Sequence, residues 1–232
     1  MAQYFHKEVA KLKRKALSLS ALVEQNVHRA VHAAVHRDAD LARQVIESDA
    51  GVDQMEVEVE EDCLKILALH QPVAIDLRFI VAILKLNNDL ERMGDLSVNI
   101  AERALGLAGF DRPPLPFDLP RLAEKVQEML KKSLDALVEL DPDTAKAVLA
   151  ADDEVDALHR RVYEWIKEEI RKDPGQIDAL LQYLSISRNL ERIADHATNV
   201  AEDVVYMVEG EIVRHSAHNP AKTRSSPAVT VS

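Results

Sequence analysis

Hydrophobic residues recur at spacings of three and four along most of this chain, which is the spacing of one face of an α-helix. The first such segment runs from His6 to Arg37 without a glycine or a proline. The pattern therefore predicts a long amphipathic helix near the start of the chain. Its hydrophobic stripe consists of Leu12, Ala16, Leu19, Val23, Val27, Ala30 and Ala34.

Five further helices follow from the same periodicity and from the breaks between the periodic segments. Turn residues at 38–40, 141–143 and 173–175 end one helix and begin the next. Gln71-Pro72 is expected to start the third helix, because a proline in the first turn loses no hydrogen bond. The predicted helices cover about residues 41–70, 71–109, 121–140, 144–172 and 176–215.

Four prolines within residues 110–120 mark the clearest boundary in the chain and predict a stiff linker. Short connections force neighbouring helices to run antiparallel. We therefore expect an all-α protein made of two tandem antiparallel three-helix bundles related by an internal repeat. The first repeat would occupy residues 1–109, the linker 110–120, the second repeat 121–215 and a polar, disordered tail 216–232.

Composition narrows the class of partner. The net charge is −11, so the chain is a poor candidate for binding nucleic acid, whose phosphates require lysine and arginine. The N-terminal turns are charged and no run of about 18 apolar residues occurs, so neither a signal sequence nor direct membrane insertion is expected. Cys63 is the only cysteine and continues a helical stripe, which predicts a core residue. These features favour a cytoplasmic protein.

The strongest internal signal is a repeat of charged as well as apolar residues. Residues 84–103 (LKLNNDLERMGDLSVNIAER) align without a gap with residues 184–203 (LSISRNLERIADHATNVAED). Each copy places a glutamate four residues before an aspartate, as Glu91/Asp95 and Glu191/Asp195. Apolar packing alone does not require acids to be duplicated, so this pattern indicates a chemical role.

A second pair of acids lies one helix earlier in each half, as Asp49/Asp53 and Asp152/Asp156. Residues four apart share one face of a helix, and like charges there repel. If the paired helices face each other, four carboxylates converge and a multivalent cation would neutralise them. Solvated faces with ion pairs to neighbouring arginines are the alternative. The candidate metal ligands are Asp49, Asp53, Glu91 and Asp95 in one half and Asp152, Asp156, Glu191 and Asp195 in the other.

Histidines at positions 28, 32 and 36 form a separate stripe on the first helix. Histidines four apart on a helix can chelate a metal ion, but a hydrated or partner-facing stripe is the preferred interpretation. The role of this stripe stays open at the level of sequence.

Enzymatic interpretations find less support. A ferritin-type metal enzyme needs Glu-x-x-His on two helices, and the nearest match is Asp156-x-x-His159 in one half only. No P-loop, dinucleotide fingerprint or nucleophile elbow occurs in the sequence. His159 and His196 could act as bases, but neither has a counterpart in the first half. A non-enzymatic protein is predicted, with a metal-dependent hydrolase or oxidase and a plain helical scaffold as alternatives.

Three motifs in a fixed order resemble the PhoU family of bacterial phosphate-transport accessory and regulatory proteins. They read VIE-x-D-x-x-VD over residues 45–53, QP-x-x-x-DLR over 71–78 and LER-x-GD over 90–95. The resemblance covers about residues 5–215. The second repeat departs from it, because residues 173–178 replace the QP-x-x-x-DLR motif.

The resemblance implies two three-helix bundles side by side, with metal clusters bound by the repeated E(D)-x-x-x-D motifs. Iron or zinc would be the expected metal, ahead of magnesium or manganese. It also implies a cytoplasmic negative regulator of phosphate uptake and of the phosphate-starvation response. The implied partners are the ATPase subunit of the phosphate ABC importer, a phosphate sensor histidine kinase and a second copy of the chain in a homodimer.

Overall fold

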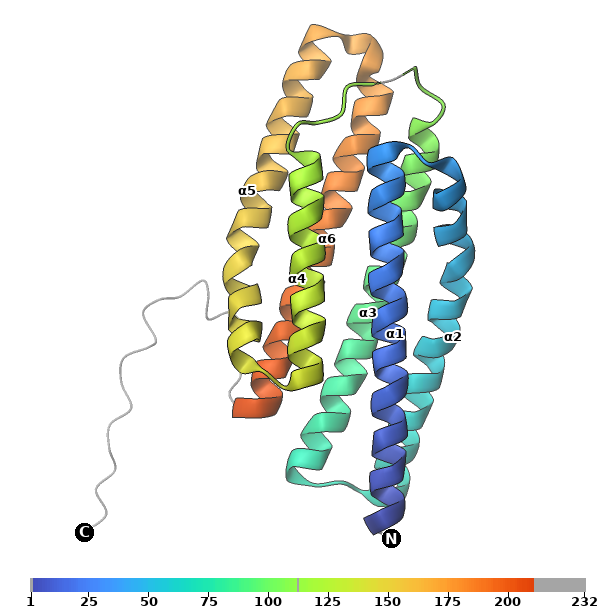
Figure 1. The fold of residues 1–232 in the computed structure, drawn as a ribbon, viewed down its shortest axis with the longest axis vertical. Helices are drawn as coiled ribbons and strands as arrows, with labels where there is room; N and C mark the ends of the chain where they lie inside the picture. The colour runs from blue at the N-terminus through green and yellow to red at the C-terminus, as the bar shows by residue number, and fades with distance from the viewer. Residues whose placement is uncertain (1, 112, 211–232) are drawn as a thin grey trace, which may run out of the picture.

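The computed structural model describes residues 2–111 and 113–210, and its long elements in these ranges are six α-helices (Figure 1). The predicted all-α class with two three-helix repeats is confirmed. The helices are α1 (Ala2–His36), α2 (Ala39–His70), α3 (Ala74–Leu107), α4 (Leu119–Glu139), α5 (Pro142–Lys172) and α6 (Ile177–Glu209), with a short 3-10 helix η1 (Pro174–Gln176) before α6.

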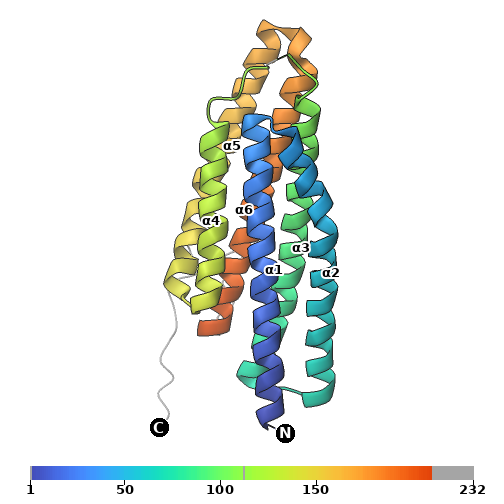
Figure 2. The ribbon, with the colours of Figure 1, turned by 45° about the vertical axis from the view of Figure 1, so that its right-hand side comes forward.

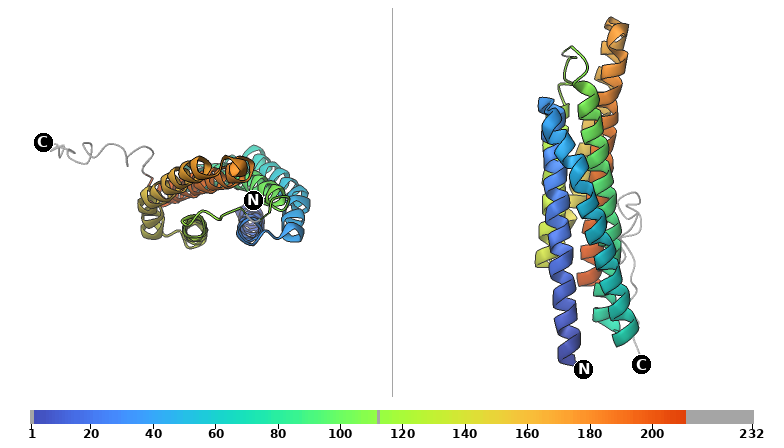
Figure 3. Two further views of the ribbon diagram at one scale, coloured as in Figure 1. Left: turned by 90° about the horizontal axis from the view of Figure 1, so that it is seen from above. Right: turned by 90° about the vertical axis from the view of Figure 1, so that its right-hand side faces the viewer.

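The six helices form two layers that run along the length of the molecule. Seen end-on, α5, α6, α3 and α2 make a curved layer, and α1 and α4 lie on its concave side (Figure 3, left). Within each repeat every helix contacts the other two, while the two repeats meet mainly through α3 and α6. The views in Figures 1 and 2 agree that α1 and α4 are neighbours in the second layer.

The predicted stripe of α1 forms part of one continuous core that spans both repeats. Leu12, Leu19, Val23 and Val27 are fully buried, as predicted. Cys63 also lies in this core, and burial raises the pKa of its thiol to about 12, so the thiol stays protonated.

Turn chemistry explains several helix boundaries. Asp38 caps α2 by accepting a hydrogen bond from the backbone N–H of Leu41 at 2.9 Å, and a cap of this kind contributes about 1 kcal/mol. Asp141 caps α5 in the same way, and Pro142 occupies the first helical position. The fifth helix consequently begins at Pro142, two residues before the predicted Thr144.

The start of the third helix was predicted wrongly. It begins at Ala74, so Pro72 lies in the connection and not in the first turn. Gln71 has a left-handed backbone with φ of 45° and ends α2 by donating its N–H to the carbonyl of Leu67. A residue before proline is disfavoured in the right-handed helical region, so the chain leaves the helix at this point.

Two other boundaries also differ from expectation. The helix α4 starts at Leu119 and includes Pro120 in its first turn, so the irregular linker ends at residue 118. The helix α6 ends at Glu209 because Gly210 adopts a left-handed φ of 74° and donates its N–H to Tyr206. The predicted helix therefore stops at Glu209 within the described residues, while the rest of its expected continuation, residues 211–215, and the predicted tail 216–232 lie outside them.

Arg37 joins the first repeat to the linker and to the second repeat. Its Nη2 donates to the carbonyl oxygen of Pro113 at 2.6 Å and to the hydroxyl of the buried Tyr183 at 3.4 Å. The end of α1 is thus fixed to residues that are distant in sequence.

Candidate functional site

The acids of α2 and α3 lie on the sides of these helices that face each other. Gly94 allows a close approach, because a Cβ built there would lie only 3.1 Å from Cγ1 of Val52 and 3.9 Å from Oδ1 of Asp49. Burial, followed by the charges of Asp53 and Asp95, raises the pKa of Asp49 above its ordinary value. Asp95 acts on Asp49 from the opposite helix, so the two pairs share one electrostatic environment.

Glu91 shows the same coupling from the side of α3. Its pKa is raised by burial and by Asp95, with smaller contributions from Glu56 and Asp53, while Arg92 opposes the shift. Arg92 is the nearby cation, with its Nε 3.4 Å from Glu91 and its Nη1 3.9 Å from Asp95. Its side chain is more than half exposed, which weakens both contacts through solvent screening. One exposed arginine therefore faces several acids.

The second repeat brings the equivalent residues of α5 and α6 together. Burial, then Asp156 and more weakly Asp152, raises the pKa of Glu191. Burial, then Glu191 and Asp156, raises the pKa of Asp195. Arg188 and Arg192 oppose the shift of Glu191, and His196 and Arg192 oppose that of Asp195, but the net direction of both is upward. We refer to the two groups as the α2–α3 acidic site and the α5–α6 acidic site.

Each acidic site contains a residue that the sequence analysis did not select. Glu56 lies three residues after Asp53, and His159 lies three residues after Asp156, so the two occupy equivalent positions in the repeat. His159 thus has no histidine counterpart in the first repeat, where Glu56 occupies the equivalent position. The sequence does contain the signal for this pair. The same offset that relates Asp53 to Asp156 also relates Glu56 to His159.

The structure gives Glu56 and His159 equivalent partners on the facing helix. The Nδ2 of Asn87 donates to Oε1 of Glu56 at 2.9 Å, and Nδ1 of His159 lies 2.7 Å from Oγ of Ser187. Asn87 and Ser187 are themselves equivalent in the repeat. Burial lowers the pKa of His159, which favours the neutral imidazole that can bind a metal.

His196 belongs to a different group of polar residues, at the contact between α3 and α6. Its Nδ1 lies 2.8 Å from Oδ1 of Asp89, which also accepts a hydrogen bond from Nδ2 of Asn199 at 3.1 Å. Asp89 is almost completely buried. His196 thus joins the two repeats through Asp89, a contact between helices that sequence spacing could not reveal.

The donor chemistry of both acidic sites fits a metal ion. Carboxylate oxygens are the ligands of hard cations, and the imidazole of His159 adds a nitrogen donor suited to zinc or iron. Among the described residues, no three His, Cys, Asp or Glu side chains converge closely enough to enclose an ion. Binding would therefore require rotation of these partly exposed side chains.

A known protein family matches the chain twice, once in each repeat. A family model described as "PhoU domain" matches residues 16–104 and again residues 119–204. The chain belongs to the PhoU family. The two PhoU matches cover the two three-helix repeats, and both acidic sites fall inside them.

Named relatives extend the match over the length of the protein. The chain is 38% identical over 216 residues to a phosphate-specific transport system accessory protein PhoU homolog of Pseudomonas aeruginosa, covering 93% of this chain and 89% of the relative. A homolog of the same name from Aquifex aeolicus is 39% identical over 211 residues, with 90% and 95% coverage. These names describe accessory proteins, which confirms the non-enzymatic prediction at the level of the family.

Solved PhoU structures share the arrangement of the helices. The crystal structure of PhoU from Pseudomonas aeruginosa superposes with a TM-score of 0.87 at 37% identity and covers 89% of this chain and 100% of that one. The phosphate transport system regulatory protein PhoU from Streptococcus pneumoniae gives a TM-score of 0.80 at 31% identity, with 90% and 99% coverage. Within residues 2–111 and 113–210, no helix is both long and apolar enough to cross a bilayer.

Proposed function

We propose that this protein regulates phosphate uptake and the phosphate-starvation response. The observation that carries the proposal is its similarity to phosphate-specific transport accessory proteins across both repeats, over 93% of this chain and 89% of the first relative. An accessory protein acts through contact with the proteins of the system it serves. We propose the ATPase subunit of the phosphate importer and a phosphate sensor kinase as its partners.

Affinity purification of the tagged full-length chain from cells grown in high phosphate tests these partners. The importer ATPase and the kinase are expected to be enriched over a tagged helical protein of similar size and charge. Mass spectrometry after mild cross-linking provides the measurement, since regulatory contacts are often transient. Recovery of neither component would contradict the proposed mode of action.

We further propose that each acidic site binds a metal ion. Asp49, Asp53, Glu56, Glu91 and Asp95 would supply oxygen ligands in the α2–α3 acidic site, which suits magnesium, manganese or iron. His159 adds a nitrogen ligand in the α5–α6 acidic site, which favours zinc or iron. A bound cation would neutralise these acids, because burial and, after it, mutual repulsion raise the pKa values of Asp49, Glu91, Glu191 and Asp195.

A further inference from the structure

The histidine stripe on α1 lies outside both acidic sites. His28, His32 and His36 follow one another at intervals of four, so they share one side of the helix. All three side chains are exposed. This side of α1 belongs to the second layer of the molecule, whereas the acidic sites lie between α2 and α3 and between α5 and α6.

His32 and His36 are close enough to share one metal ion. Their ring centroids lie 4.3 Å apart with an angle of 41° between the ring planes. Metal–imidazole bonds of about 2.0–2.1 Å place the two ligand nitrogens of a shared ion roughly 3–3.5 Å apart. Because residues four apart on a helix are neighbours, we expect rotation of the two exposed rings to bring one nitrogen of each to this spacing.

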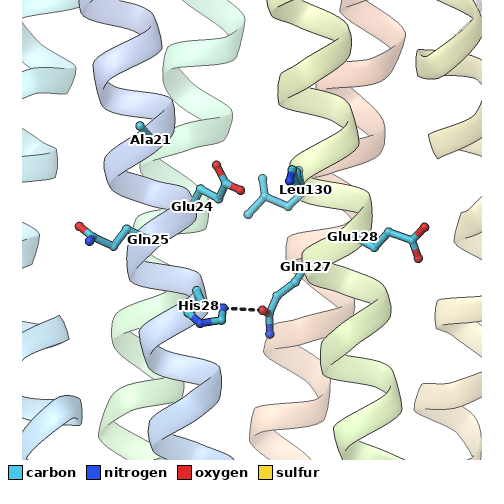
Figure 4. Close-up of a pocket in the computed structure, with 8 residues that line it drawn as sticks. Ala21, Glu24, Gln25, His28, Gln127, Glu128 and Leu130 are labelled. Carbon is cyan, nitrogen blue, oxygen red and sulfur yellow. Dashed lines mark hydrogen bonds between the residues drawn. The ribbon is translucent and has the colours of Figure 1, made fainter.

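His28 makes a different contact. Its Nδ1 lies 2.8 Å from Oε1 of Gln127 on α4, as the dashed line in Figure 4 shows. An amide oxygen can only accept a hydrogen bond, so the imidazole donates from Nδ1. This bond holds the His28 ring toward α4, beside a shallow pocket where Glu24 and Leu130 face each other. His32 and His36 are therefore the pair that faces each other within the stripe.

The position of His36 favours a cation as well. It is the last residue of α1, where the helix dipole places partial negative charge. Arg37 follows directly and bonds to Pro113 and Tyr183, so this end of α1 is held in place by the rest of the fold. A metal ion bound here would connect the last two turns of a helix end that is already ordered.

We propose that His32 and His36 form a second kind of metal site, a two-histidine chelate for a borderline transition-metal ion such as Ni²⁺ or Zn²⁺. Imidazole suits these ions better than magnesium or calcium, which prefer oxygen ligands. The site is independent of the acidic sites and of the proposed regulatory function. It supplies two protein ligands and leaves the remaining coordination positions to water.

Titration of the ¹⁵N-labelled full-length protein with Ni²⁺ tests this proposal, with the histidine ring resonances observed by NMR. Paramagnetic broadening is expected first at the rings of His32 and His36. His32→Gln and His36→Gln should each weaken this site by about tenfold or more, because one imidazole then binds alone. His28→Gln is the matched control and should leave the affinity unchanged.

The Asp95→Ala/Asp195→Ala variant separates this site from the acidic sites, since the histidine response should persist in it. All three histidines are exposed, so the glutamine variants are expected to fold, which circular dichroism verifies. Unchanged Ni²⁺ affinity in His32→Gln would overturn the proposal. An equal loss of affinity in His28→Gln and His36→Gln would also overturn it.

Discussion

Protein carrying Asp95→Ala and Asp195→Ala is expected to bind about tenfold less iron or zinc at its acidic sites than the unaltered chain. Burial is the main cause of the raised pKa of Asp49, and Asp95 adds to it across the α2–α3 contact. Asp195 shares its surroundings with Glu191 and Asp156. Each substitution removes one proposed carboxylate ligand and part of the negative charge that would attract a cation. Elemental analysis of protein purified without chelators and dialysed against metal-free buffer provides the measurement.

Asp76→Ala/Asp178→Ala is the matched control for this experiment. These exposed aspartates lie in the first turns of α3 and α6, so the control removes the same charge from the same helices away from the acidic sites. Its metal content should equal that of the unaltered chain. Equal metal content in the Asp95/Asp195 variant would instead exclude these two residues as important ligands.

The free energy of unfolding of the Asp95→Ala/Asp195→Ala variant, measured with and without metal, distinguishes a metal site from an acidic surface. Without metal, removing Asp95 and Asp195 relieves like-charge repulsion worth about 0.2–0.5 kcal/mol for each pair four residues apart on a helix. The metal-free variant should then be at least as stable as the metal-free original. With metal present the order should reverse, because binding stabilises only the chain that retains its ligands.

Gly94→Leu is expected to lower the free energy of unfolding by about 1–3 kcal/mol. A Cβ at this position would already lie 3.1 Å from Val52, and the rest of a leucine side chain would force α2 and α3 apart. The α2–α3 acidic site should lose its metal as a result, while the α5–α6 acidic site keeps its own. Urea denaturation and elemental analysis measure the two effects.

Gly51→Leu serves as the control for Gly94→Leu. Gly51 is an exposed residue of α2, and the nearest atom to a Cβ there is Cδ2 of Leu22 at 4.0 Å. Replacing this glycine should stabilise the protein by about 0.5–1 kcal/mol through helix propensity. A Gly94→Leu protein as stable as the Gly51→Leu protein would show that the approach of α2 to α3 does not depend on Gly94.

The helices were predictable because hydrophobic residues recur at helical spacing over long segments, and turn residues interrupt these segments. The capping residues Asp38 and Asp141 act locally, so the approximate starts of α2 and α5 can be read from the sequence. Pro72 was misplaced because the same residue fits both a first turn and a connection. The left-handed backbone of Gln71 ends α2 and places Pro72 in the connection, and this conformation cannot be predicted from a glutamine in the sequence.

The acidic sites were only partly predictable for a related reason. Spacing shows that Asp49 and Asp53 share a face of one helix, but the rotation of α2 against α3 depends on packing at Gly94 and Val52. Glu56 was missed because its repeat partner is a histidine and not another acid. The Asp89–His196 contact joins residues from both repeats, so it becomes visible only in the folded chain.

The most direct test of the regulatory role is a phosphate-starvation promoter reporter in a bacterial strain that lacks its own PhoU-family protein. In high phosphate, this chain is expected to restore repression to the level seen with the resident protein. Repression should not depend on the chain when the importer ATPase is also deleted, because the proposed signal passes through that partner. A reporter that stays fully active while the chain accumulates to the resident protein's level would contradict the account.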